Sequence, residues 1–335
     1  GFMAVCVTDF VQGTLMLIGL LVVPLVAYFL LPGNLTDLIS QSSVTGGAGA
    51  YLNPFMNGDR PYTFIEIFSQ LAWGFGYCGM PHVLVRFMAV KNEKELKKSW
   101  AIAIVWDLLS LTAAFAIAVI GRAYLLPVIL GENGAASSES VFIEMIRKVF
   151  TSELALPFIG GLFLCGILAA IMSTADSQLL VTASAVSEDL YHSFIKKDAD
   201  TEEILKVSRI TVIVIAVIAF AIAWNPDSSI MGLVSNAWAG LGSAFGPLVV
   251  MSLFWKRTNL PGAIAGLLSG ALTVIIWDYI PLIGGQTPYV ATGLYSLVVG
   301  FIISLIFIIV VSLITKAPEE SIVEEFETYK AYKEQ

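Results

Sequence analysis

Hydrophobic residues gather along the chain in stretches long enough to cross a lipid bilayer. A helical crossing needs about 20 predominantly apolar residues. Eight stretches meet this requirement, at 4–31, 62–90, 99–126, 155–190, 207–224, 230–254, 260–280 and 290–315. Between the third and the fourth, SSESVFIEMIRKVF (137–150) predicts a short amphipathic helix outside the bilayer, with Val141, Ile143, Met145 and Ile146 on its apolar side. The pattern predicts an all-α, polytopic membrane domain over residues 1–316 and a polar tail at 317–335.

Composition agrees with a membrane protein and limits the possible partners. Hydrophobic residues make up 57% of the chain and charged residues 13%, against about 25% charged residues in soluble domains. The net charge is −8, and the tail contributes −4 of it with six Glu and two Lys. We therefore interpret the acidity as a solvated tail. Because no basic patch is interleaved with aromatic residues, we expect no nucleic-acid partner.

Lysine and arginine alternate between loops in a way that predicts orientation. The loops after the second, fourth, sixth and eighth stretches hold eleven basic residues, and the alternate loops hold only Arg60, Arg122, Arg147 and Lys148. Cytoplasmic loops carry the excess of Lys and Arg. This predicts that both ends of the chain are cytoplasmic, with the tail an acidic cytoplasmic segment.

Polar side chains in the fourth stretch share one helical face. Ala170, Ser173, Thr174 and Ser177 follow the spacing i, i+3, i+4, i+7. Such hydroxyls either donate back to the carbonyl four residues earlier or offer oxygen ligands to a hard cation. The neighbouring Asp176 favours the cation, because an ionisable residue at membrane depth indicates function.

The second stretch combines an apolar composition with residues that interrupt helices. SQLAWGFGYCGMPH (69–82) contains Gly74, Gly76, Gly79 and Pro81. This density predicts a broken helix, and discontinuous helices mark substrate and ion sites in secondary transporters. Trp73 and Tyr77 flank the predicted break and are candidates for one wall of a small cavity. The alternative is a kink with ordinary aromatic packing.

Other candidate residues carry weaker signals. Asp9 lies in TDFVQ (8–12), and from the sequence alone it is either an intramembrane functional group or an interfacial carboxylate. Asp107 has no obvious partner. Cys6, Cys78 and Cys165 all lie in apolar stretches, which favours packing over disulfides. The sequence contains no Walker motif and no nucleophile elbow, so we expect neither ATP-driven transport nor an enzyme.

Four stretches together resemble the sodium/solute symporter family, most closely its sodium:proline branch. They are TDFVQ (8–12), WGFGYCGMPHVLVRFMA (73–89), ILAAIMSTADSQLLVTASAVSEDLY (167–191) and NPDSSIMGLVSNAWAGLGSAFGP (225–247). The resemblance extends to about residue 315. It implies a LeuT-like inverted-repeat bundle in which about the first four core helices would precede this chain.

The resemblance also implies roles for individual residues. The backbone carbonyl of Ala170 and the hydroxyls of Ser173 and Thr174 would bind Na⁺, and Asp9 would serve sodium coupling. The substrate-binding residues would be Trp73, Tyr77 and Pro81. Asp176 and Ser177 are possible additional ligands, although Asp176 departs from the proline branch, where Ser is frequent at this position.

The function implied is sodium-coupled symport of proline across the cytoplasmic membrane (the cell inner membrane) by alternating access. One alternative is sodium symport of another small solute, such as pantothenate or another amino acid. Another is the membrane portion of a sensor protein. The 19 residues after Lys316 are too few for a folded signalling domain, which favours the transporter.

Overall fold

The computed structural model describes residues 2–42, 46–125, 139–224 and 229–333. The chain divides into two compact units. The first unit comprises Gly1–Pro61 and Val90–Asp227, and the second comprises Tyr62–Ala89 and Ser228–Gln335. Residues 126, 137–138, 225–228 and 334–335, which belong to predicted segments or to the motif at 225–247, lie outside the described residues.

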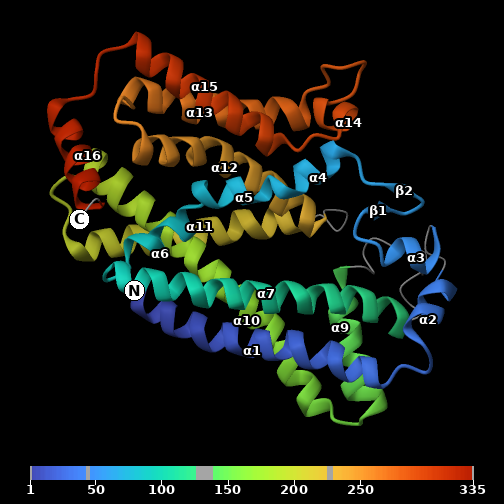
Figure 1. Cartoon of the computed structure of the whole chain (residues 1–335). Helices are drawn as coiled ribbons and strands as arrows, with labels where there is room; N and C mark the ends of the chain where they lie inside the picture. Colours follow the sequence, from blue (N-terminus) through green and yellow to red (C-terminus); the bar gives the residue numbers. More distant parts are fainter. Residues whose placement is uncertain (1, 43–45, 126–138, 225–228, 334–335) are drawn as a thin grey trace. The chain divides into compact units, whose positions relative to one another are not determined.

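The first unit is built on four long helices. Its elements are α1 (Phe2–Phe29), α2 (Leu35–Gln41), α3 (Gly47–Tyr51), the short antiparallel pair β1 (Met56–Asn57) and β2 (Arg60–Pro61), α7 (Glu93–Tyr124), α9 (Val141–Ile146), the π-helical η3 (Arg147–Glu153), α10 (Pro157–Ser184), the π-helical η4 (Ala185–Ile195) and α11 (Thr201–Ala223) (Figure 1). Helix α1 packs against both α7 and α10, and α11 packs against α10 and η4.

Local signals explain where these helices begin. The Asn92 side chain accepts the N–H of Glu95, and the Asp200 side chain accepts the N–H of Glu203. Both are N-caps, which satisfy N–H groups that have no partner within the helix. As a result α7 starts at Glu93, before the predicted apolar stretch 99–126, and α11 starts at Thr201, before the predicted 207–224.

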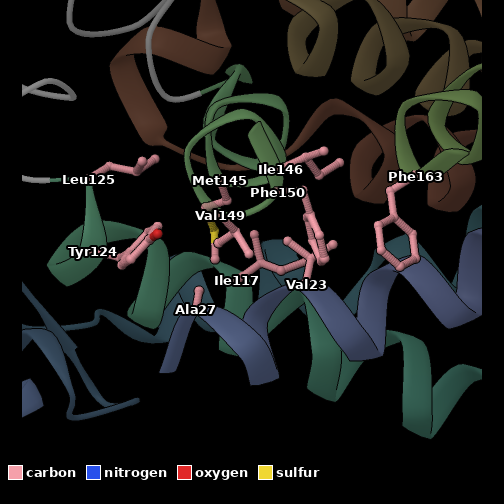
Figure 2. Packing of buried hydrophobic residues seen from close by; sticks show 10 residues of the cluster. All are labelled: Val23, Ala27, Ile117, Tyr124, Leu125, Met145, Ile146, Val149, Phe150 and Phe163. Atoms are coloured by element: carbon pink, nitrogen blue, oxygen red, sulfur yellow. The ribbon is translucent and has the colours of Figure 1, made fainter. Parts of the chain in front are cut away.

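The core of the first unit lies where α1, α7, α9, η3 and α10 meet. Figure 2 shows its buried members, Val23, Ala27, Ile117, Tyr124, Leu125, Met145, Ile146, Val149, Phe150 and Phe163. The predicted amphipathic helix is thus part of this core, through Met145 and Ile146. The prediction was wrong for Ile143, which is 42% exposed, because at 100° per residue it lies at the edge of the buried face.

The second unit contains the interrupted segment and three long helices. Its elements are α4 (Phe64–Leu71), α5 (Trp73–Gly76), the 3₁₀ turn η1 (Tyr77–Gly79), α6 (Pro81–Met88), α12 (Ile230–Phe254), α13 (Leu260–Tyr279), α14 (Pro288–Thr292), α15 (Ser296–Ile314) and α16 (Glu320–Lys333). Helix α13 packs along α15, and α12 packs against both (Figure 1).

The pair α13–α15 is fastened along its length and at both ends. A Cβ atom on Gly266 would come within 2.2 Å of Ile308 Cγ1, so only glycine permits this approach. At one end the Asn259 amide donates to the Lys316 carbonyl at 2.6 Å. At the other end the Trp277 indole N–H donates to the Leu294 carbonyl at 2.9 Å, and the Ser296 hydroxyl donates to Asp278 Oδ2 at 2.7 Å.

Seven helices among the described residues are long and apolar enough to span a membrane. They are Val5–Phe29, Glu93–Tyr124, Pro157–Ile195, Thr201–Ala223, Ile230–Phe254, Leu260–Tyr279 and Ser296–Ile314. They match seven of the eight predicted stretches, and the remaining one, 62–90, is divided into short pieces. The last stretch begins at Ser296 instead of 290, because Gly293, with φ 69°, ends the separate helix α14.

Candidate functional site

The segment 62–90 is interrupted where glycine and proline are densest. Helix α4 begins with a capping box, in which the Thr63 hydroxyl accepts the N–H of Glu66 and the Glu66 carboxylate accepts the N–H of Thr63. After η1, Met80 adopts an extended backbone with φ −85° and ψ 111°. Pro81 then begins α6, and a residue before proline is disfavoured from helical geometry. The predicted break is therefore present, and it divides the segment at the predicted residues.

Four aromatic side chains surround the first part of this break. This aromatic cluster consists of Trp73, Tyr77, Trp238 and Tyr295. The Trp73 ring stacks on Trp238 at 5.6 Å and on Tyr295 at 5.9 Å between centroids, and the Tyr77 ring meets Trp238 edge-on at 4.8 Å. Trp73 is half-buried, whereas Tyr77 is 57% exposed. One predicted wall residue is thus held in place and the other is accessible.

Hydrogen bonds fix the aromatic cluster to three helices of the second unit. The indole N–H of Trp238 in α12 donates to the Trp73 carbonyl at 3.0 Å. The Tyr295 backbone N–H donates to the Ser69 hydroxyl in α4 at 3.1 Å, and the Tyr295 hydroxyl donates to the Ser235 carbonyl in α12 at 2.7 Å. Sequence reasoning did not identify Trp238 or Tyr295 as site residues.

The glycines of the break allow its backbone to lie directly on α12. A Cβ atom on Gly76 would come within 2.0 Å of Trp238 Nε1, and one on Gly79 would come within 2.7 Å of the Leu241 carbonyl oxygen. Pro81, the third predicted substrate residue, is half-buried at the first turn of α6. Glycine here serves close packing as well as interruption of the helix.

The predicted cation-binding residues lie along α10 in the first unit. Ser177 is buried, Ala170, Ser173 and Asp176 are half-buried, and Thr174 is exposed. The Thr174 hydroxyl donates to the Ala170 carbonyl at 3.4 Å, and the Ser177 hydroxyl donates to the Ser173 carbonyl at 2.9 Å. Bonding back to the helix therefore occurs at two of the predicted positions. A hydroxyl that donates its proton keeps its oxygen lone pairs, so these bonds leave ligation of a cation open.

Helix α1 brings Asp9 to the level of the predicted cation-binding residues of α10. The two helices run antiparallel: Gly166 faces Leu15, and Gly19 faces Phe163. Continuing this register by about two helical turns brings Asp9 level with Ser173. Asp9 is half-buried, and its Oδ1 atom is shielded from solvent. The predicted residues therefore form two groups, one within each unit.

Comparison with known proteins identifies relatives that are all named as solute transporters. The sodium:solute symporter family model matches residues 1–270. The osmoregulated proline transporter OpuE of Bacillus subtilis is 43% identical over 96% of this chain and 61% of its own length. The high-affinity proline transporter PutP of Bacillus subtilis is 38% identical over 98% of this chain and 65% of its own length. The sodium/proline symporter of Escherichia coli is 38% identical over 97% of this chain and 61% of its own length. The chain thus spans less than two thirds of the length of these relatives.

A solved structure shares the fold. It is a Na⁺-coupled sialic acid symporter in a substrate-bound outward-open state, with a TM-score of 0.64 and 18% sequence identity, covering 95% of this chain and 64% of that chain. At 18% identity this similarity is evidence for the fold alone. It confirms the predicted all-α, LeuT-like membrane bundle.

Proposed function

The chain belongs to the sodium:solute symporter family, and on this basis we propose that it serves sodium-coupled uptake of proline. The observation that carries the substrate assignment is the interrupted helix with its aromatic cluster. Relatives named as proline transporters, at 38–43% identity over nearly the whole chain, support the same assignment.

The substrate wall would be formed by Trp73, Tyr77 and Pro81. Proline combines an apolar ring with a carboxylate and a secondary ammonium group. Aromatic rings suit the apolar ring of proline; Tyr77, which is 57% exposed, would meet it directly, and the half-buried Trp73 would line the wall beside it. The ends of broken helices offer backbone N–H and carbonyl groups for the charged part of a substrate.

Sodium would be held on the polar face of α10, by the Ala170 carbonyl and the hydroxyls of Ser173 and Thr174. The Thr174 hydroxyl oxygen and the Ala170 carbonyl oxygen lie 3.4 Å apart. Two oxygens that bind one Ca²⁺-sized ion at about 2.4 Å and at right angles have roughly this separation, and Na⁺ is close to Ca²⁺ in size. Asp9 would supply negative charge from α1, and Asp176 and Ser177 are further candidates.

Coupling follows from thermodynamics. If bound sodium raises the affinity for proline by some factor, bound proline raises the affinity for sodium by the same factor. A sodium gradient can then drive proline inward. In the proposed setting the protein is a multi-pass protein of the cytoplasmic membrane, with both ends of this chain on the cytoplasmic side because basic residues are concentrated in those loops.

Uptake of labelled proline tests the proposal directly. The protein would be expressed in cells that lack their own proline transporters, and uptake would be compared in sodium and choline buffers. We expect saturable uptake that requires sodium and that excess unlabelled pantothenate leaves unchanged. Uptake that is indifferent to sodium would refute the coupling. Stronger competition by pantothenate than by proline would refute the substrate and leave the family assignment intact.

A further inference from the structure

Trp238 contacts the broken helix in three different ways. Its indole N–H donates to the Trp73 carbonyl at 3.0 Å, its ring stacks on the Trp73 ring at 5.6 Å, and the edge contact with Tyr77 measures 4.8 Å. One side chain from α12 therefore touches the backbone and both aromatic rings of the predicted substrate wall. Its backbone lies within the long helix α12.

The surrounding residues leave the indole little freedom. Gly76 faces Trp238 Nε1 so closely that a methyl group there would collide with it at 2.0 Å. The Tyr295 ring also stacks on Trp73, at 5.9 Å between centroids, and its hydroxyl donates to the Ser235 carbonyl, less than one helical turn before Trp238. The Trp73 ring thus stacks on two aromatic rings, of which Trp238 belongs to α12 and Tyr295 is hydrogen-bonded to it.

We propose that Trp238 is a positioning residue that fixes the orientation of Trp73 and Tyr77 and thereby selects the ring size of the imino acid. The inference rests on the proposed function for its substrate, but its structural part concerns the second unit alone. In this proposal the spacing and angle between the two wall rings set the size of the ring that the wall accepts. Trp238 supplies this constraint through one hydrogen bond and two ring contacts.

Removal of the indole N–H is the direct perturbation. Trp238→Phe keeps an aromatic ring and deletes the donor to the Trp73 carbonyl. A neutral hydrogen bond contributes about 1 kcal/mol net, which corresponds to about a fivefold change in the ratio of the constrained to the unconstrained conformer. We expect the half-saturating proline concentration to rise, by up to about fivefold. We also expect four- and six-membered ring analogues, azetidine-2-carboxylate and pipecolate, to compete better relative to proline than they do in the wild type.

Two further variants make the result specific. Gly76→Ala displaces the indole, because the added methyl group would come within 2.0 Å of Nε1, and it should give the same change in ring-size preference. Trp277→Phe is the matched control, since it also deletes an indole N–H bonded to a backbone carbonyl, that of Leu294 at 2.9 Å. Among the ring contacts of the described residues, none joins Trp277 to Trp73 or Tyr77. The Trp277→Phe variant should therefore keep the ring-size preference of the wild type.

A second readout does not depend on any substrate. Cys78 lies within η1 and is half-buried, and Cys6→Ser with Cys165→Ser leaves it as the single thiol. The rate of its labelling by maleimide then reports how tightly the broken segment is held. We expect about a fivefold faster rate in Trp238→Phe and in Gly76→Ala, and no change in Trp277→Phe.

The two readouts separate the positioning role from the transport assignment. An unchanged labelling rate in both Trp238→Phe and Gly76→Ala overturns the proposal, as does an unchanged ring-size order in a protein whose wild type transports proline. If the wild type transports no imino acid but the labelling rates change as expected, the positioning of the broken helix by Trp238 stands and the proposed function fails.

Discussion

Thr174 offers a sharp test of the sodium site, because its hydroxyl can be removed without changing the shape of the side chain. Thr174→Val replaces by a methyl group the hydroxyl whose oxygen lies 3.4 Å from the Ala170 carbonyl oxygen. A polar contact to a charged group contributes about 1.5–3 kcal/mol, or roughly a 10- to 150-fold change in affinity. Thr174 is exposed, so water can replace the lost ligand. We therefore expect the lower end of this range, about a tenfold higher sodium requirement.

The assay is the sodium concentration that gives half-maximal proline uptake. Thr174→Ser restores a hydroxyl and should return this concentration to near the wild-type value. Thr182→Ala is the matched control, since its hydroxyl is also exposed and also donates back along α10, to the Gln178 carbonyl at 2.8 Å. At saturating sodium the affinity for proline should change little in any of these variants, because all sites are then filled.

The reasoning would be refuted by either of two results. One is a half-saturating sodium concentration in Thr174→Val within twofold of the wild type. The other is an equal rise in Thr182→Ala, because the effect would then come from removing any hydroxyl on this helix.

Three other expectations follow from the described contacts. Asp9→Asn removes the negative charge that we propose supports sodium binding and should raise the sodium requirement by about tenfold or more, whereas Asp107→Asn, on the exposed face of α7, should leave it unchanged in the same uptake assay. Gly266→Ala places a methyl group 2.2 Å from Ile308 Cγ1 and should lower stability by about 1–3 kcal/mol, measured as earlier thermal unfolding in detergent; Gly161→Ala, with no neighbour within 4 Å, should not lower it. The hydrogen bond from Lys256 lowers the pKa of Glu327 in α16, so the ion pair is complete at neutral pH and is lost as the pH falls through this lowered pKa, below the ordinary range of a glutamate. Carbon-detected NMR titration should show a higher Glu327 pKa in Lys256→Met, and an equal pKa in both proteins would contradict the pairing.

The sequence was sufficient for features that depend on local chemistry. Apolar length predicted the long helices, and the density of Gly74, Gly76, Gly79 and Pro81 predicted the break, because glycine and proline act on the backbone directly. Capping shifted the helix starts by several residues, as at Asn92, since a polar first turn carries no hydropathy signal.

Features that depend on packing between distant segments were not predictable in the same way. Trp238 lies 165 residues from Trp73 in the chain, and its sequence context, NAWAG, indicates only a helix rich in small residues. The exposure of Thr174 and of Ile143 likewise depends on which neighbours cover each helix. A pattern along one helix identifies a face but not what covers it.

The fastening of α13 to α15 at both ends has a practical consequence for labelling the protein. The connection between α13 and α14 contains Gly284 and Gly285, both with positive φ and with open space around them. The two helices are held at this end by Trp277 and Ser296, outside the connection itself. An epitope or a fluorescent protein inserted between Gly284 and Gly285 should therefore be accepted without loss of uptake. The predicted orientation places this loop on the side of the membrane opposite the cytoplasm, so antibodies should reach the tag on intact spheroplasts.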